Sequence, residues 1–175
     1  AVNPLLLPYL VTSLEPALKN SYLGLVTGAG LVLAVVIQPL SGGLSDRSRS
    51  RWGRRRPWIV GGTLFDLLFL AVIALSGNIW LLFLGYCLLQ TSSNVAHGPY
   101  QGFIPDLVPD KQKGLASGVK NLVELIALVL CSAIIGEFLK NDQPVPAIAL
   151  MAAILLVAAV ITVLTVHEKQ PVTDA

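Results

Sequence analysis

Five apolar stretches, each long enough to cross a bilayer as a helix, constrain the fold of this 175-residue chain more than any other feature. The hydrocarbon core of a bilayer is about 30 Å thick, so a helix needs ~20 mainly apolar residues to cross it. The stretches lack the alternation of barrel strands and are about twice as long as such strands. Because backbone polar groups in lipid must be bonded internally, we expect an all-α, polytopic bundle of transmembrane helices. The predicted spans are residues 23–44, 58–76, 79–103, 115–138 and 147–166.

The composition excludes several other classes of protein. Hydrophobic residues make up 54% of the chain and charged residues only 13%, whereas a soluble domain carries roughly 25% charged residues and a disordered chain is much less apolar. Cys87 and Cys131 lie inside apolar runs without metal-ligand or redox spacing, so we interpret them as packing residues. The sequence contains no phosphate-binding loop, zinc-ligand spacing or nucleophile elbow. We therefore predict no enzymatic activity, no cofactor and no metal site.

Residues 4–11 form a shorter apolar stretch that cannot cross a bilayer. Neither an initiator methionine nor a basic segment precedes them, so they do not resemble a signal peptide. We expect residues 1–12 to be the end of a helix whose beginning is missing. The chain is then predicted to be a fragment, with five full spans and the end of a sixth.

The basic residues predict the orientation of the spans. All six arginines lie in one loop, from Arg47 to Arg56, which we call the arginine loop. Alternate loops place nine basic residues on one side and only Lys19 and Lys140 on the other, leaving aside Lys120 inside a span. Because cytoplasmic loops are enriched in Lys and Arg, we expect the arginine loop and the C-terminus to be cytoplasmic in a multi-pass protein of the cell membrane. The nine are Arg47, Arg49, Arg51, Arg54, Arg55, Arg56, Lys111, Lys113 and Lys169.

The arginine loop has two interpretations as a partner surface. Its six positive charges would suggest nucleic acid or anionic lipid if the loop stood alone. Between two spans its simpler role is to fix the topology and contact lipid headgroups. We therefore expect the lipid bilayer, and no nucleic acid, as its partner.

The same loop carries a family signature. The run from Gly42 to Pro57 resembles the signature between the second and third helices of the major facilitator superfamily. Its longer form at Ser50–Ile59 is similar to the sucrose transporters and the glycoside–pentoside–hexuronide:cation symporters, as are Gln38-Pro39-Leu40, Asn94-Val95, Gly98-Pro99 and Asp106-Leu107. The resemblance implies that residues 1–175 are an amino-terminal six-helix half-domain, with its first helix truncated and the carboxy-terminal half-domain missing from the chain.

The resemblance also implies an inner gate at the arginine loop. In such transporters the acidic residue after the glycines of the second helix pairs with arginines when the inner side is closed. That role falls on Asp46, with Arg47 and either Arg54 or Arg55 as partners. Asp106 is a third candidate, or else a turn or cap residue ahead of the next helix. The predicted gate residues are Gly42, Gly43, Asp46, Arg47, Gly53, Arg54, Arg55 and Asp106.

A polar face on the span 79–103 predicts a cavity. Its members are spaced i, i+4, i+7 and i+11, which places them on one side of a helix. Polar groups are costly in hydrocarbon, so this face must contact protein or line a water-filled cavity; interhelical hydrogen bonding alone is the alternative. We expect Gly98-Pro99 to interrupt the helix and free the carbonyl of Val95. The candidate substrate residues are Gln90, Asn94, His97 and Gln101, with Gln38 and Asn121 from other spans.

Ionisable residues inside the spans are candidates for proton coupling. Asp66 and Glu124 lie roughly 14–15 Å along their helices at 1.5 Å per residue, near the middle of a ~30 Å core. A charge is expensive there and is a functional candidate by default. Lys120, one turn before Glu124, belongs to the same candidate set; mutual neutralisation of the two is the alternative. Asp66 has no such neighbour on its own helix and needs a partner elsewhere or a proton.

Together these patterns predict a secondary active transporter that works by alternating access. The expected partners are a small-molecule solute, a sugar or glycoside, and a coupling cation, which we hypothesise to be the proton. Two alternatives stay open at this point. One is a major facilitator transporter of a non-carbohydrate solute, such as a drug or metabolite. The other is a non-transporting membrane scaffold, in which the polar faces interlock without a cavity.

Overall fold

The computed structural model describes residues 5–48, 50 and 53–165, and this part of the chain is helical and contains no strand. The predicted all-α fold is confirmed. The 3₁₀ turn η2 (Asp110–Gln112) precedes the sixth helix. The helices are α1 (Leu7–Leu14), α2 (Lys19–Asp46), α3 (Arg56–Ala74), α4 (Ile79–Gln101), α5 (Phe103–Leu107), α6 (Lys113–Lys140) and α7 (Pro144–Thr165).

Five helical segments are long and apolar enough to cross a membrane, and each overlaps one predicted span. Many of their large apolar side chains are exposed, above all on α2, α6 and α7, as expected where lipid is the solvent. The predicted first helix, residues 1–12, corresponds to α1, which continues to Leu14. Some residues for which the sequence makes predictions lie outside the described part of the chain: residues 1–4, Arg49, Arg51, Val166 and Lys169.

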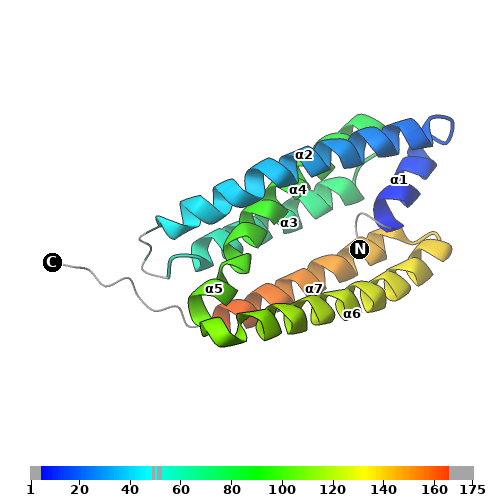
Figure 1. Cartoon of the computed structure of the whole chain (residues 1–175). Helices are drawn as coiled ribbons and strands as arrows, with labels where there is room; N and C mark the ends of the chain where they lie inside the picture. The colour runs from blue at the N-terminus through cyan, green and yellow to red at the C-terminus, as the bar shows by residue number, and fades with distance from the viewer. Residues whose placement is uncertain (1–4, 49, 51–52, 166–175) are drawn as a thin grey trace.

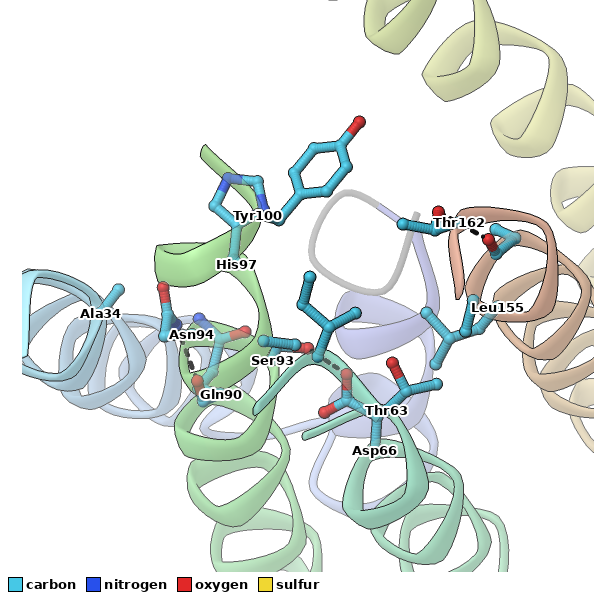
Figure 2. A pocket seen from close by; sticks show the side chains of 14 residues that line it. Ala34, Thr63, Asp66, Gln90, Ser93, Asn94, His97, Tyr100, Leu155 and Thr162 are labelled. Carbon is cyan, nitrogen blue, oxygen red and sulfur yellow. Dashed lines mark hydrogen bonds between the residues drawn. The ribbon is translucent and has the colours of Figure 1, made fainter. Parts of the chain in front are cut away.

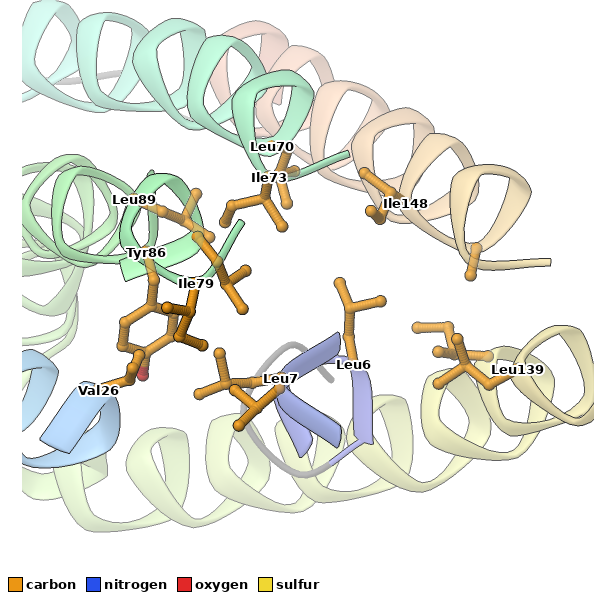
Figure 3. Packing of buried hydrophobic residues seen from close by; sticks show 14 residues of the cluster. Leu6, Leu7, Val26, Leu70, Ile73, Ile79, Tyr86, Leu89, Leu139 and Ile148 are labelled. Atoms are coloured by element: carbon orange, nitrogen blue, oxygen red, sulfur yellow. The ribbon is translucent and has the colours of Figure 1, made fainter. Parts of the chain in front are cut away.

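The helices form two groups joined by α1 and α5 (Figure 1). Helices α2, α3 and α4 pack closely together, and α7 packs against α3 and runs beside α6. The short α1 inserts apolar side chains between the groups: Leu6 and Leu7 are 0% and 1% exposed (Figure 3). They contact a cluster that includes Tyr86 of α4 and Ile148 of α7. This packing holds the polar face of α4 beside α3 and α7.

Two glycines allow α4 to approach its neighbours closely. A Cβ atom on Gly62 of α3 would lie 2.8 Å from the backbone oxygen of Ser92. A Cβ on Gly98 of α4 would overlap the Ser41 hydroxyl and the backbone oxygen of Gln38 on α2. Small residues at membrane helix interfaces permit such close backbone packing. These contacts fix the position of the functional groups on α4.

The predicted interruption at Gly98-Pro99 is wrong in its position. Helix α4 continues through Pro99 to Gln101, and the change of direction falls at Gly102, before the short α5. Proline removes a single backbone donor, and neighbouring helices can compensate for this in a membrane protein. The amide of Gly102 donates to the oxygen of Pro99 at 3.1 Å and closes the last turn of α4.

Candidate functional site

Asp66 is the central feature of the site. It lies on α3, is 3% exposed, and its carboxylate receives hydrogen bonds from two adjacent hydroxyl groups of α4. Ser92 donates to Oδ1, and Ser93 donates to Oδ2 at 2.9 Å. None of the ion pairs formed within the described part of the chain involves Asp66. The carboxylate is thus held by dipoles and not by an opposite charge.

Asp66 borders a cavity of about 460 Å³, which we call the Asp66 cavity. In Figure 2, Asp66 and Thr63 reach it from α3, opposite Leu155 and Thr162 of α7. A space of this size holds several water molecules, and its polar lining gives them partners. The lining residues are Ala34, Ile59, Thr63, Asp66, Gln90, Ser93, Asn94, Ala96, His97, Tyr100, Leu155, Ala158, Ala159 and Thr162.

The polar face of α4 contributes three of the predicted cavity residues, Gln90, Asn94 and His97. The Asn94 amide also donates to the backbone oxygen of Gln90 at 2.7 Å. Gln101, the fourth member of the face, is exposed beyond the cavity and contacts His97, with their Nε2 atoms 2.8 Å apart. The face therefore runs from the cavity toward the end of α4.

Two other predicted substrate residues lie away from the Asp66 cavity. Asn121 is exposed on α6. Gln38 lies on α2, and its backbone oxygen is 3.0 Å from the hydroxyl of Ser41. The same hydroxyl is 2.9 Å from the backbone oxygen of Asn94, so this contact joins α2 to α4.

Lys120 and Glu124 form an ion pair on α6, with Nζ and Oε1 2.7 Å apart. The Glu124 side chain is 47% exposed, and neither residue lines the Asp66 cavity. Lys120 instead borders a second cavity, of about 580 Å³, between α4–α5 and α6. Its ammonium group lies 5.8 Å from the centre of the Tyr100 ring. The two acidic candidates for proton coupling thus have different surroundings, because within the described part of the chain Glu124 has a cationic partner and Asp66 has none.

An ionic cluster closes the arginine-loop end of α2, α4 and α5; we define it as Asp46, Arg54, Arg55 and Asp106. The Arg55 side chain is 6% exposed, and its Nη2 lies 2.7 Å from Asp46 and 2.9 Å from Asp106. Its Nη1 donates to the oxygen of Pro99 at 3.1 Å. Arg54 pairs with Asp106 at 2.7 Å. One buried guanidinium therefore connects three helices.

The structure changes the expected partner of Asp46 and distinguishes among the glycines of the predicted gate. Asp46 pairs with Arg55 and not with Arg47, which is exposed outside the cluster. Gly53 adopts φ 104°, a conformation that favours glycine. A Cβ on Gly42 would lie 3.8 Å from the Gly98 oxygen, whereas one on Gly43 would have open space around it. Of these two glycines, Gly42 therefore packs against another helix at an ordinary van der Waals distance, and Gly43 does not.

Sequence reasoning missed several residues of the site. Ser92 and Ser93 are the principal partners of Asp66, and Tyr100 borders both cavities. The adjacent hydroxyls inside an apolar helix were a usable signal, because a buried acid needs donors. The wall formed by α7 had no comparable signal, since its lining residues include only one polar side chain, Thr162.

Comparison with known proteins identifies related sequences. The family model described as "MFS/sugar transport protein" matches residues 1–175. Lactose permease of Lactobacillus helveticus is 25% identical, over 89% of this chain and 28% of its own length. Sucrose transport protein SUT1 of Oryza sativa subsp. japonica is 33% identical, over 66% of this chain and 25% of its own. Human solute carrier family 45 member 3 is 34% identical over 55% of this chain and 20% of its own. The chain thus spans about a quarter of the length of these relatives.

Proposed function

Because the chain belongs to the MFS/sugar transport protein family, we propose that it forms part of a secondary active transporter that couples the movement of a sugar or glycoside to that of protons. Residues 1–175 are the amino-terminal half-domain of this transporter. The solute moves by alternating access at a site between this half-domain and its carboxy-terminal counterpart, as in other transporters built from repeats.

The buried Asp66 beside its cavity is the observation that carries this proposal. An isolated carboxylate at this depth is costly, and a proton removes its charge without a protein partner. Both carboxylate oxygens face hydroxyl groups that can donate to the ionised form or accept from the protonated form. The site therefore accommodates both states that a coupled cycle needs.

Glu124 is the weaker coupling candidate. Its charge is already balanced by Lys120 at 2.7 Å, and its side chain is half exposed. We assign Lys120 and Glu124 to the sugar, together with Tyr100. An ammonium group, a carboxylate and an aromatic ring can bind sugar hydroxyls and the apolar face of a sugar ring. Gln90, Asn94 and His97 supply further polar groups from the cavity.

The ionic cluster acts as the inner gate in this proposal. It joins α2 to α4 and α5 through Arg55, and the arginine loop lies on the cytoplasmic side. A scaffold with interlocked polar faces is less well supported, because Gln90, Asn94 and His97 of the polar face of α4 line a cavity.

Uptake into membrane vesicles tests the coupling role. With full-length protein, Asp66→Asn should abolish sugar accumulation driven by a pH gradient while leaving counterflow exchange, because exchange moves no net protons. Glu124→Gln is the matched amide variant on α6. It should retain accumulation when the measured uptake is corrected for any change in sugar affinity. Accumulation in Asp66→Asn equal to that of the wild type would overturn the proposal, and competition by non-carbohydrate solutes alone would reject the sugar substrate.

Cysteine labelling tests the gate. In a background without Cys87 and Cys131, a reporter cysteine at Ala159 would lie in the wall of the Asp66 cavity. Asp46→Ala removes one partner of Arg55 and should increase labelling from the arginine-loop side several-fold. Unchanged labelling would count against the gate.

A further inference from the structure

A line of polar side chains continues from Asp66 toward the arginine-loop end of α4. Ser93, His97 and Gln101 are spaced four residues apart, so they lie along one side of the helix. The first contacts Asp66 at 2.9 Å, and the last two contact each other at 2.8 Å. Ser93 and His97 both line the Asp66 cavity (Figure 2), whereas Gln101 is exposed beyond it.

The contact between His97 and Gln101 suits a group that changes its protonation state. Two nitrogen atoms face each other, so the amide of Gln101 donates to an unprotonated Nε2 of the imidazole. If Nε2 takes up a proton, a flip of the amide presents the Gln101 oxygen as its acceptor. A glutamine can therefore partner both forms of the ring without leaving a polar group unsatisfied.

The charged groups near His97 come from α3 and α6. Lys120 and Glu124 reach its neighbourhood from α6 as an ion pair of zero net charge. Asp66 faces the same cavity from α3, and the aromatic ring of Tyr100 follows on α4. The residues that α2 and α7 contribute to the cavity wall are not titratable. The titratable groups in the lining of the Asp66 cavity are thus Asp66, His97 and Tyr100.

We propose that His97, held by Gln101, relays the proton between Asp66 and water at the arginine-loop end of α4. This inference rests on the proposed proton coupling and extends it by naming the route. The carboxyl of Asp66 releases its proton to the Ser93 hydroxyl or to cavity water, which passes a proton to the imidazole. The imidazolium then gives a proton to water near Gln101, and the ring returns to its neutral form. Every proton taken up is released, so the relay needs no other reactant.

Transport by full-length protein in membrane vesicles tests the relay. Histidine is the side chain that exchanges protons near neutral pH, and glutamine keeps hydrogen bonding without that ability. His97→Gln should therefore slow pH-driven accumulation at least tenfold more than it slows counterflow exchange, with the amount of protein in the membrane unchanged. Added imidazole should restore accumulation to His97→Ala, because the enlarged cavity admits the small base. Thr91→Ala, which removes a hydroxyl bonded only within α4, is the matched control and should behave as wild type.

Each alternative outcome has a distinct meaning. Normal accumulation in His97→Gln, with Asp66→Asn inactive in accumulation, overturns the relay and leaves the proposed function intact. Equal loss of exchange and accumulation, with no effect of imidazole on His97→Ala, assigns His97 to sugar binding and also overturns the relay. Normal accumulation in Asp66→Asn instead removes the proposed coupling itself. His97→Asn repeats the test if His97→Gln does not reach the membrane.

Discussion

The ionic cluster and the Asp66 site both contain aspartate, but they neutralise it in different ways. In the cluster, Asp46 and Asp106 face arginines at 2.7–2.9 Å, near the ends of their helices. Asp66 lies within the bundle, and its hydrogen-bond partners among the described residues are the hydroxyls of Ser92 and Ser93. A carboxylate with a permanent cationic partner stays ionised, whereas one held by dipoles can exchange its charge for a proton.

This difference assigns opposite roles to the two regions. A fixed set of opposite charges favours one arrangement of helices and can be broken by competing contacts or by salt, which suits a gate. A buried carboxylate without a cation changes its charge in each cycle, which suits coupling. The following predictions test the contrast, from the largest expected effect to the smallest.

Removal of both hydroxyls at the Asp66 site should have the largest effect on stability. Hydrogen bonds to a charged group contribute about 1.5–3 kcal/mol each. Ser92→Ala combined with Ser93→Ala should therefore lower the free energy of unfolding in detergent by roughly 3 kcal/mol. Adding Asp66→Asn should recover most of this loss, because no charge is left unsatisfied. Ser76→Ala, which removes a hydroxyl that donates to the Ile73 oxygen at the end of α3, is the control. Equal effects in the double and control variants would contradict the account.

Removal of Arg55 should cost less, although it touches more groups. Its partner carboxylates are 51% and 33% exposed, so water can solvate them when the guanidinium is gone. Loss of the buried contacts should lower the free energy of unfolding by about 2 kcal/mol in Arg55→Ala. The exposed Arg47→Ala should change it by less than ~0.5 kcal/mol. If thermal or denaturant unfolding shows the two variants to be equal, Asp46 is not held by Arg55.

The outer part of the cluster should respond to salt. Arg54 and Asp106 are 39% and 33% exposed, and such pairs contribute about 0.2–1 kcal/mol at moderate ionic strength. Arg54→Ala should therefore destabilise by that amount at low salt and by almost nothing at about 1 M salt, where the Debye length is ~3 Å. The stability cost of removing Ser92 and Ser93 should not depend on salt. A salt-dependent cost at that site would remove the distinction between the two regions.

The ion pair on α6 should show the smallest effect. Lys120 and Glu124 are one turn apart, and the acid is half exposed. A pair at this spacing contributes roughly 0.3–0.5 kcal/mol. Lys120→Gln should change the unfolding free energy by no more than this, while sugar affinity measured by counterflow falls. A large loss of stability with unchanged affinity would indicate a structural role for Lys120.

Features set by a single helix could be predicted from the sequence, whereas contacts set by the packing of two helices could not. Apolar length located the spans, and the four-residue period located the polar face of α4. The depth of Asp66 along its helix also marked it as exceptional. The choice of Arg55 over Arg47 required the packing of α4 against α2 and α3, which no single-helix pattern contains. The same holds for the separation of Glu124 from the cavity, because α6 and α4 leave a gap between them.

The helix break at Gly102 shows a second limit of pattern reasoning. Proline at position 99 predicts an interruption on local grounds, yet α4 continues for two further residues, to Gln101. The Arg55 guanidinium donates to the Pro99 oxygen and occupies the space that a side chain on residue 102 would fill. The contact with Arg55 therefore leaves no room for a side chain at position 102.

The proton flux that accompanies sugar entry tests the role of Asp66 most directly. Full-length protein in lightly buffered vesicles is given external sugar without a pH gradient, and a pH electrode records the external medium. The account predicts that sugar makes the medium of wild-type vesicles more alkaline, and that Asp66→Asn vesicles exchange labelled sugar without any such change. A sugar-induced pH rise in Asp66→Asn equal to the wild-type signal would contradict the account.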